Sequence, residues 1–411
     1  MVNIIKKSVK YISIAYHFMQ RTIKIKLQTS SALINTIKTG NEIFKEILQV
    51  GLSKKTYNKK VLHRLTYKKL RKRYAQFPSA LLQTVRDVAS EALKATRLEK
   101  EINAKNRTSL RLDKRNLRVD LLHRQISISS IEGRLKLKFG SENPECRNPQ
   151  FEKYADWKPM AGTLVFKDNR LYLNLVVEKE PPPPMFSSSA SDFLGIDRGI
   201  NNILTCSNNQ FFNSAHLRKV KGEYQYQRKV LQSKGTSSAR RKLARIAGRE
   251  RRFVSDINHR LSKAIAESDY KVFVLEDLHK MTDKKKGRTF NRKLGNWSFR
   301  QFAEFLKYKA EGLGKGILSV NPKYTSQMCS RCGHREKSNR KNSNFKCRRC
   351  LFELNADLNA ARNIAKLGIS EFSRLTVNQP KADHENWPAG VTPDELHQQG
   401  GQLQTDQFIG R

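Results

Sequence analysis

Four cysteines in two closely spaced pairs form the most specific chemical pattern in this sequence. Cys329-x-x-Cys332 is followed by 14 residues and then by Cys347-x-x-Cys350. Two such turns can face each other and offer four thiolates to one Zn²⁺ ion in tetrahedral geometry. Because the two cysteine pairs lie so close in the sequence, they are unlike four free thiols and unlike a redox-active Cys-x-x-Cys pair. Since four thiolates close the coordination sphere, we expect one structural zinc ion, bound by Cys329, Cys332, Cys347 and Cys350.

Three acidic residues occur where a strand or a helix would present them. Two follow short apolar runs and one opens an amphipathic helical pattern; these residues are Asp197, Glu276 and Asp357. Such a set can hold two Mg²⁺ ions about 4 Å apart for hydrolysis of a phosphodiester bond. A single acid in such a position is more often a turn former or a helix cap, and spacing alone does not exclude Asp277 or Glu353.

The elements that must position these acids follow from the hydrophobic pattern. The runs Phe193–Ile196, Val272–Leu275 and Ile317–Val320 are typical of buried strands. Between the first two, a hairpin around Ile203–Cys206 precedes a long helical stretch over roughly His216–Ser268. The order of strands and helices predicts an α/β domain whose strand ends carry Asp197 and Glu276.

The N-terminal half has a different pattern. Residues 23–27 alternate as a strand does, Ser30 or Ser31 is placed to cap a helix, and the next ~70 residues have helical spacing. Residues 101–180 are typical of β-strands, with a hairpin turn at Lys167–Arg170. The four prolines of Pro181–Pro184 and the serines after them predict a stiff linker.

The overall charge points to a polyanionic partner. Lys and Arg total 80 against 37 Asp and Glu, a formal net charge of +43. A compact protein with this surplus repels itself, and binding to nucleic acid relieves that repulsion by releasing condensed counterions. Six cysteines, too few for a secreted disulfide scaffold, favour a reducing, intracellular location, and no apolar run of about 18 residues predicts a membrane span.

Two stretches are candidates for contact with nucleic-acid phosphates. Residues 54–73 contain ten basic residues and no acid, with tyrosines beside them that can stack on bases. Residues 217–252 contain thirteen basic residues and two glutamates. A solvated helix face is the alternative. The candidate contacts are Lys54, Lys55, Lys59, Lys60, Arg64, Lys68, Lys69, Arg71, Lys72, Arg73, Arg240, Arg241, Lys242, Arg245 and Arg249.

Several of these motifs resemble those of TnpB proteins, the transposon-encoded relatives of type V CRISPR effectors. The segments Gly195–Gly199, Val274–Leu278 and Asp357–Ile364 are similar to the three RuvC motifs of that family. Tyr324–Gly333 resembles the entry to its zinc ribbon. Asn296–Phe299 and Tyr308–Ala310 resemble the insert between the second and third motifs. The motif-level likeness covers about residues 192–367.

The resemblance implies a multidomain α+β architecture around an RNase H-like (RuvC) nuclease domain with an inserted four-cysteine zinc ribbon. We expect these parts in chain order: an N-terminal extension and first wedge strand at 1–28, a helical recognition domain at 29–100, a β-rich, barrel-like wedge domain at 101–180, a linker at 181–191, the RuvC-like domain at 192–322, the zinc ribbon at 323–352, a C-terminal RuvC helix at 353–369 and a disordered tail at 370–411.

The resemblance also implies a function. The expected protein is a cytoplasmic, nucleoid-associated DNA endonuclease that binds a guide RNA made from the transposon end. It would recognise a short adjacent motif and cut complementary double-stranded DNA. The metal-binding triad of the family maps onto Asp197, Glu276 and Asp357, with two Mg²⁺ ions there and one Zn²⁺ in the ribbon. No membrane partner is expected, and a monomer is favoured.

Other functions share part of this pattern. A compact type V CRISPR effector has nearly every motif, and a CRISPR array or a transposon end beside the gene distinguishes the two. A nuclease-silent RNA-guided regulator would have lost acids that this chain keeps. A transposase is disfavoured by the basic helices and the ribbon. A zinc-ribbon binding protein without enzyme activity leaves the three acids unexplained.

Overall fold

The computed structural model describes residues 18–98, 109–139, 152–185, 189–199, 201–278 and 299–377. The chain forms two compact units, each made of more than one chain segment. The first contains Met1–Phe186, Leu217–Lys271 and Gly295–Ile317, and the second contains Ser187–His216, Val272–Leu294 and Leu318–Arg411. None of the helices within the described ranges is long and apolar enough to cross a membrane.

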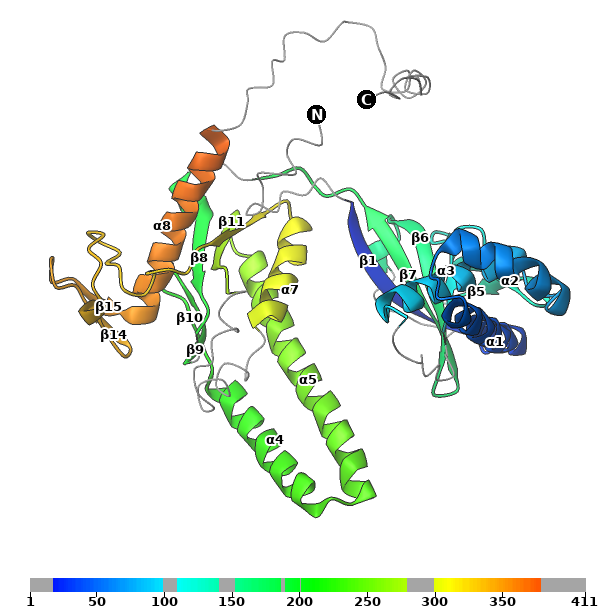
Figure 1. Ribbon diagram of the computed structural model, residues 1–411. Coiled ribbons are helices and arrows are strands. Elements are labelled where there is room, and N and C mark those ends of the chain that lie inside the picture. The colour runs from blue at the N-terminus through cyan, green and yellow to red at the C-terminus, as the bar shows by residue number, and fades with distance from the viewer. Residues whose placement is uncertain are drawn as a thin grey trace, which may run out of the picture. The chain divides into compact units, whose positions relative to one another are not determined.

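An antiparallel sheet in the order β1-β7-β6-β2 forms the base of the first unit (Figure 1). The predicted strand at 23–27 is confirmed within β1 (Met19–Leu27), which pairs with β7 (Arg170–Lys179) along its whole length. β6 (Lys158–Lys167) joins β7 through Asp168 and Asn169, whose φ angles are 52° and 55°. Two positive φ values make the tight turn that suits a hairpin, as predicted. β2 spans Ser109–Leu112.

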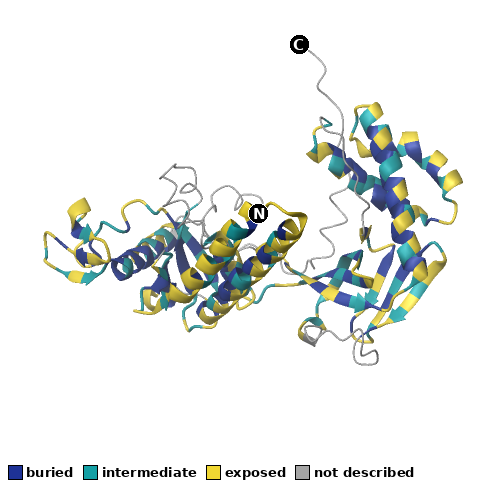
Figure 2. Ribbon diagram, turned by 90° about the horizontal axis from the view of Figure 1, so that it is seen from below, coloured by how far each residue is buried: buried dark blue, intermediate teal, exposed yellow. Residues whose placement is uncertain are grey.

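Three helices and a second small sheet complete this part of the first unit. The helices are α1 (Ser31–Ser53), capped by Ser30 as predicted, α2 (Lys59–Arg73) and α3 (Ser79–Ala95). The small sheet contains β3 (Leu117–Asp120), β4 (Gln125–Ser130) and β5 (Gly133–Lys138). Helices and sheets share one hydrophobic core, to which Ile23, Ile47 and Leu81 contribute. Figure 2 shows the buried and exposed residues alternating along these strands.

The basic stretch predicted as one long helix is two helices in the structure. α4 (Ala215–Lys234) and α5 (Ser237–Ala266) are separated at Gly235, whose φ of 63° ends the first helix. Thr236 caps the second by accepting a hydrogen bond from the Ala239 amide at 3.2 Å. The prediction overlooked this break, although Gly235 and Thr236 are residue types that end one helix and cap the next. α7 (Phe299–Glu311) packs on α5.

A five-stranded mixed sheet in the order β10-β9-β8-β11-β12 forms the centre of the second unit. β8 pairs antiparallel with β9 and parallel with β11, and β9 pairs antiparallel with β10. The bounds are β8 Phe193–Asp197, β9 Asn202–Cys206, β10 Phe211–Asn213, β11 Val272–Glu276 and β12 Gly316–Val320. These strands confirm the apolar runs singled out in the sequence.

Helix α8 (Ala356–Val377) lies against this sheet along β8 (Figure 1). The approach is close because Gly195 of β8 faces the helix and Gly368 of the helix faces β11. A Cβ atom on Gly195 would lie 2.1 Å from the Ala361 carbonyl oxygen, and one on Gly368 would lie 2.4 Å from Val274 Cγ2. Any larger residue at these positions would separate the helix from the sheet.

The C-terminal end of α8 differs from its prediction. The helix was expected to end at residue 369 and to be followed by a disordered tail, but it continues to Val377. Phe372 is buried and meets the Phe193 ring edge to face, with centroids 5.4 Å apart. This apolar contact holds the last turns on the sheet. The rest of the expected tail lies outside the described residues.

Candidate active site and cysteine cluster

Two of the three predicted acids lie at one edge of the central sheet. The parallel pairing of β8 with β11 runs from Phe193 opposite Val272 to Ile196 opposite Leu275. Asp197 and Glu276 are the next residues of the two strands. Because the carboxyl ends of parallel strands meet at one edge, the two carboxylates are neighbours. Asp357 lies in the first turn of α8, which packs on β8.

Glu276 is held by groups from two other segments. The hydroxyl of Thr325 donates a hydrogen bond to its carboxylate oxygen Oε1 at 2.5 Å. The guanidinium of Arg198 donates to its backbone carbonyl. Thr325 precedes the first cysteine pair by four residues, so the segment that enters the cysteine cluster also contacts the acid site.

Asp357 has two partners in the structure. Arg340 donates to its Oδ1 at 3.0 Å, and the side-chain amide of Asn202 donates to its Oδ2 at 3.3 Å. Arg340 lies in the short strand β13 (Arg340–Lys341), between the two cysteine pairs. The sequence pattern does not reveal this pairing of Arg340 with the third acid, which the structure shows.

Crowding of negative charge changes the acid–base properties of the site. Burial, followed by the negative charges of Glu276 and Asp357, raises the pKa of Asp197 from 3.8 to about 8. Burial also raises the pKa of Glu276, against the opposing effect of the Thr325 hydrogen bond. A cation placed among the three carboxylates would relieve this repulsion, so the donor set is chemically suited to divalent ions.

The three carboxylates do not form a compact single-ion site as the side chains stand. Within the described ranges, the four cysteines are the only group of three or more His, Cys, Asp or Glu residues whose ligand atoms all lie within 4.8 Å of one another. Oxygens around one Mg²⁺ lie at most about 4.2 Å apart, since each bond is about 2.1 Å. Ligands shared by two ions about 4 Å apart span a wider space. The positions of the three carboxylates therefore disfavour a single ion bound by all of them and are compatible with two ions.

The cysteine cluster has the dimensions of a tetrahedral metal site. Cys329 Sγ and Cys350 Sγ lie 3.8 Å apart, and Cys332 Sγ and Cys347 Sγ lie 3.6 Å apart. Four sulfurs at about 2.3 Å from a zinc ion would be about 3.8 Å from each other. The observed spacing fits that ion closely.

The two cysteine pairs adopt the same local turn. The amides of Gly333 and Leu351 donate to the carbonyls of Cys329 and Cys347 at 2.9 and 3.0 Å. Both donors have positive φ angles, 75° and 57°. Beside the cluster, β14 (Asn344–Lys346) pairs with β13 on one side and with β15 (Glu353–Asn355) on the other. Glu353, an alternative acid in the sequence, forms a salt bridge with Lys346 at 2.5 Å and is 64% exposed.

Two asparagines of α8 are functional candidates whose contacts the sequence did not reveal. Asn359 and Asn363 are fully buried and hydrogen-bond the chain between Thr325 and Ser330. Their spacing of four residues places both on one helix face. That regular spacing of amides within an apolar helix was the available signal.

The predicted nucleic-acid contacts form two exposed basic helix faces in the first unit. One lies on α2 and the turn before it, and the other on the first half of α5. Three members of the α2 set are engaged within the protein. Lys59 is 3.9 Å from Asp87, Arg73 is 3.2 Å from Glu46, and Arg71 donates to the Phe77 carbonyl.

A polar pocket of about 450 Å³ adjoins Asp357 in the second unit. Its lining includes Asn201, Gln327, Lys337, Arg340 and Ser343. These side chains offer hydrogen-bond donors and positive charge beside a carboxylate. The pocket has the size and the chemistry for part of a nucleotide chain.

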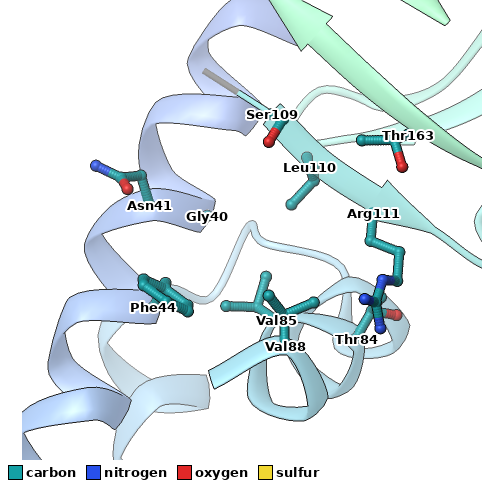
Figure 3. Close-up of a pocket in the computed structure, with 10 residues that line it drawn as sticks. All are labelled: Gly40, Asn41, Phe44, Thr84, Val85, Val88, Ser109, Leu110, Arg111 and Thr163. Atoms are coloured by element: carbon teal, nitrogen blue, oxygen red, sulfur yellow. The ribbon is translucent and has the colours of Figure 1, made fainter. Parts of the chain in front are cut away.

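A second, smaller pocket lies in the first unit between α1, α3 and β2 (Figure 3). Its volume is about 160 Å³, and none of its ten lining residues is acidic. Arg111, at its side, pairs with Glu91 at 2.9 Å. This pocket lacks the carboxylates that metal-dependent hydrolysis requires.

Two family models match separate parts of the chain. Residues 174–285 match the OrfB_IS605 family, described as a probable transposase, and residues 299–364 match the Cas12f1-like TNB domain. Among curated proteins, the putative RNA-guided DNA endonuclease InsQ of Escherichia coli is 29% identical over 263 residues. The TnpB-like protein MJ0751 of Methanocaldococcus jannaschii is 29% identical over 158 residues. These matches show that the chain is similar to TnpB-like proteins over part of its length.

The type V effectors are also among its relatives. The CRISPR-associated endodeoxyribonuclease Cas12f1 of Sulfoacidibacillus thermotolerans is 30% identical over 236 residues. Matches to Cas12f1, InsQ and MJ0751 cover 51%, 56% and 36% of this chain and span 54%, 64% and 56% of the relatives' own lengths.

A solved structure shares the fold. The chain in the structure of a Cas12f1–sgRNA–target DNA complex superposes with a TM-score of 0.59 at 16% identity, over 82% of both chains. The multidomain α/β fold of this TnpB relative is therefore of the Cas12f1 type.

Proposed function

We propose that this chain is an RNA-guided DNA endonuclease of the TnpB type, with Asp197, Glu276 and Asp357 as its metal-binding catalytic acids. The observation that carries the proposal is the meeting of Asp197 and Glu276 at one sheet edge, where burial, and after it the charges of the other two acids, raises the pKa of Asp197 to about 8. Unrelated surface carboxylates would not disturb one another in this way.

The arrangement of the sheet supports an RNase H-like, RuvC-type nuclease domain. In the sheet, β10–β9 and β9–β8 are antiparallel neighbours, and β8–β11 is a parallel pair. Asp197 and Glu276 end the two parallel strands, and Asp357 lies at the start of α8. In such a site two Mg²⁺ ions would supply an activated water and stabilise the leaving oxygen. Asp197, Glu276 and Asp357 would hold them, while Arg340 supplies positive charge beside the scissile strand.

The cysteine cluster is proposed to hold one structural Zn²⁺ ion. Sulfur spacings of 3.6 and 3.8 Å fit a tetrahedral site with no open position. Arg340 and Thr325 extend from this module to the acid site, so zinc would fix both.

The proposed partners are a guide RNA and double-stranded target DNA. The relatives are named as RNA-guided or CRISPR-associated nucleases, and the net charge of +43 suits a large polyanion. The basic faces of α2 and α5 are proposed to grip RNA or heteroduplex phosphates. In domain terms, residues 29–100 and 101–180 would act as the recognition and wedge parts, and the protein would act on DNA in the nucleoid.

A compact type V CRISPR effector is the second candidate. The match to the Cas12f1-like TNB domain and the 30% identity to a Cas12f1 favour it. The two candidates differ in the origin of the guide, so sequencing the RNA that copurifies with the protein distinguishes them. Transposon-end sequence supports the TnpB type, and CRISPR-repeat sequence supports the effector.

Cleavage of a guide-matched plasmid tests the nuclease itself. We expect the RNA-loaded protein to cut, and D197N, E276Q and D357N to lose cutting while they retain the RNA. E353Q is the matched control, since Glu353 is an exposed acid on the cysteine module. Wild-type cleavage by any triad variant would remove that residue from the site, and no specific RNA with the wild-type protein would overturn the guided mechanism.

A further inference from the structure

Thr325 is a buried hydroxyl residue in the segment that leads into the cysteine cluster. It is 3% exposed, and its Oγ1 lies 2.5 Å from Glu276 Oε1 and 3.1 Å from the Pro322 carbonyl oxygen. A hydroxyl has one proton to donate, and the shorter contact to a carboxylate is the stronger hydrogen bond. The Thr325 hydroxyl therefore donates its hydrogen bond to Glu276.

The backbone of Thr325 is itself held by the helix that carries Asp357. The Asn363 side-chain amide donates to the Thr325 carbonyl at 2.9 Å and to the Met328 carbonyl at 2.6 Å. Asn359 donates to the Met328 carbonyl at 2.8 Å and accepts from the Ser330 amide at 2.9 Å. The short segment before and within the first cysteine pair is thus fastened to α8.

These contacts connect two acids that belong to different elements. Glu276 ends β11, and Asp357 lies in the first turn of α8, two residues before Asn359. The path between them runs from the helix through the Asn363 amide to the Thr325 backbone, and from the Thr325 hydroxyl to the Glu276 carboxylate. A carboxylate that binds a metal through one oxygen is commonly oriented by a hydrogen bond to the other.

We propose that Thr325 is a positioning residue for the acid site, a role that rests on the proposed nuclease function. Its hydroxyl fixes Oε1 of Glu276, which leaves the second oxygen directed toward a divalent ion. The side-chain amide of Asn363 holds the Thr325 backbone in place against α8. The cysteine module therefore contributes to the geometry of the acid site as well as to its own fold.

The substitution Thr325→Val tests this role because valine keeps the shape and removes the hydroxyl. Thr325→Ser restores the donor. The matched control is Thr66→Val, since Thr66 is a buried threonine of α2 whose hydroxyl donates to the Leu62 carbonyl of its own helix at 2.7 Å. Each variant is prepared as the RNA-loaded full chain. Mn²⁺ binding is followed by the loss of the free-ion electron paramagnetic resonance signal, with D357N as the reference for Mn²⁺ bound by RNA.

We expect T325V to bind Mn²⁺ about tenfold to hundredfold more weakly than wild type, with zinc content unchanged by mass spectrometry. T325S and T66V should stay within about twofold of wild type. Cleavage should need correspondingly more Mg²⁺ in T325V, with the maximal rate partly recovered at high Mg²⁺.

Two results would overturn the proposal. One is wild-type Mn²⁺ affinity in T325V. The other is loss of zinc from T325V, which would show that the hydroxyl holds the cysteine module and not Glu276. If the wild-type complex binds Mn²⁺ at this site but cuts no DNA, the nuclease proposal fails while the Mn²⁺ titration still decides the role of Thr325.

Discussion

Burial and the negative charges of Glu276 and Asp357 raise the pKa of Asp197 to about 8 from its ordinary value of 3.8. The folded protein without divalent ions therefore binds a proton that the unfolded chain releases near pH 4. Its free energy of unfolding should fall as the pH rises from about 4 to about 8, because the unfolded state binds fewer protons in that window. Added Mg²⁺ should oppose this loss, since it binds the deprotonated site.

Thermal unfolding between pH 5 and pH 8, with and without Mg²⁺, measures this effect. The matched variant is Asp197→Asn, which has no proton to lose at that position. We expect a shallower pH dependence and a smaller Mg²⁺ stabilisation in the variant. Equal slopes in the two proteins would mean that Asp197 is not the coupled group.

Packing of α8 on β8 depends on the absence of a side chain at Gly195. A Cβ atom there would meet backbone atoms, the Ala361 carbonyl oxygen at 2.1 Å and the Ala365 nitrogen at 2.5 Å. Backbone cannot move aside as a flexible side chain can, so Gly195→Ala should destabilise the protein by about 3 kcal/mol or more.

Gly222→Ala is the control for this substitution. Gly222 lies within α4 with no atom near the position of an added Cβ, and alanine favours a helix over glycine by about 1 kcal/mol. Chemical denaturation should show the two variants shifted in opposite directions. A small loss in both would show that the helix can move away from the strand without cost.

The last turns of α8 give a prediction about truncation. Phe372 is buried against Phe193, so a chain that ends at residue 369 loses an apolar contact that a chain ending at Val377 keeps. We expect the shorter chain to unfold at lower temperature, by several degrees for a loss of about 2 kcal/mol. Identical melting of the two truncated proteins would place the end of the folded helix at residue 369.

The short-range features of the fold were predictable from the sequence, and the long-range contacts were not. Buried strands ending in Asp197 and Glu276 followed from apolar runs, and the cysteine turns from their spacing. The break at Gly235 was missed although the sequence Gly235-Thr236 carries the local signals that end one helix and cap another. The bonds from Thr325 to Glu276 and from Arg340 to Asp357 join residues 49 and 17 positions apart, and only the folded chain brings them together.

For the molecule as a whole, charge would set the strength of the proposed nucleic-acid binding. Replacing Arg240, Arg241, Lys242, Arg245 and Arg249 with glutamine removes five positive charges from the exposed face of α5. Each lost phosphate contact should lower the slope of log affinity against log salt by about 0.7–0.9. Guide-RNA binding measured from 50 to 300 mM salt gives that slope directly. An unchanged slope would show that this face points away from the RNA.

The order of the acids along the chain has a consequence for protein synthesis. β8 emerges from the ribosome early, whereas α8, which covers Gly195 and carries Asp357, follows about 160 residues later. Because synthesis proceeds from the N-terminus, a nascent chain exposes its basic α2 and α5 faces long before the third carboxylate exists. A transcript interrupted anywhere upstream of residue 357 therefore encodes a product without the full acid set. Under the proposed function, translation itself would delay cutting until Asp357 has been made.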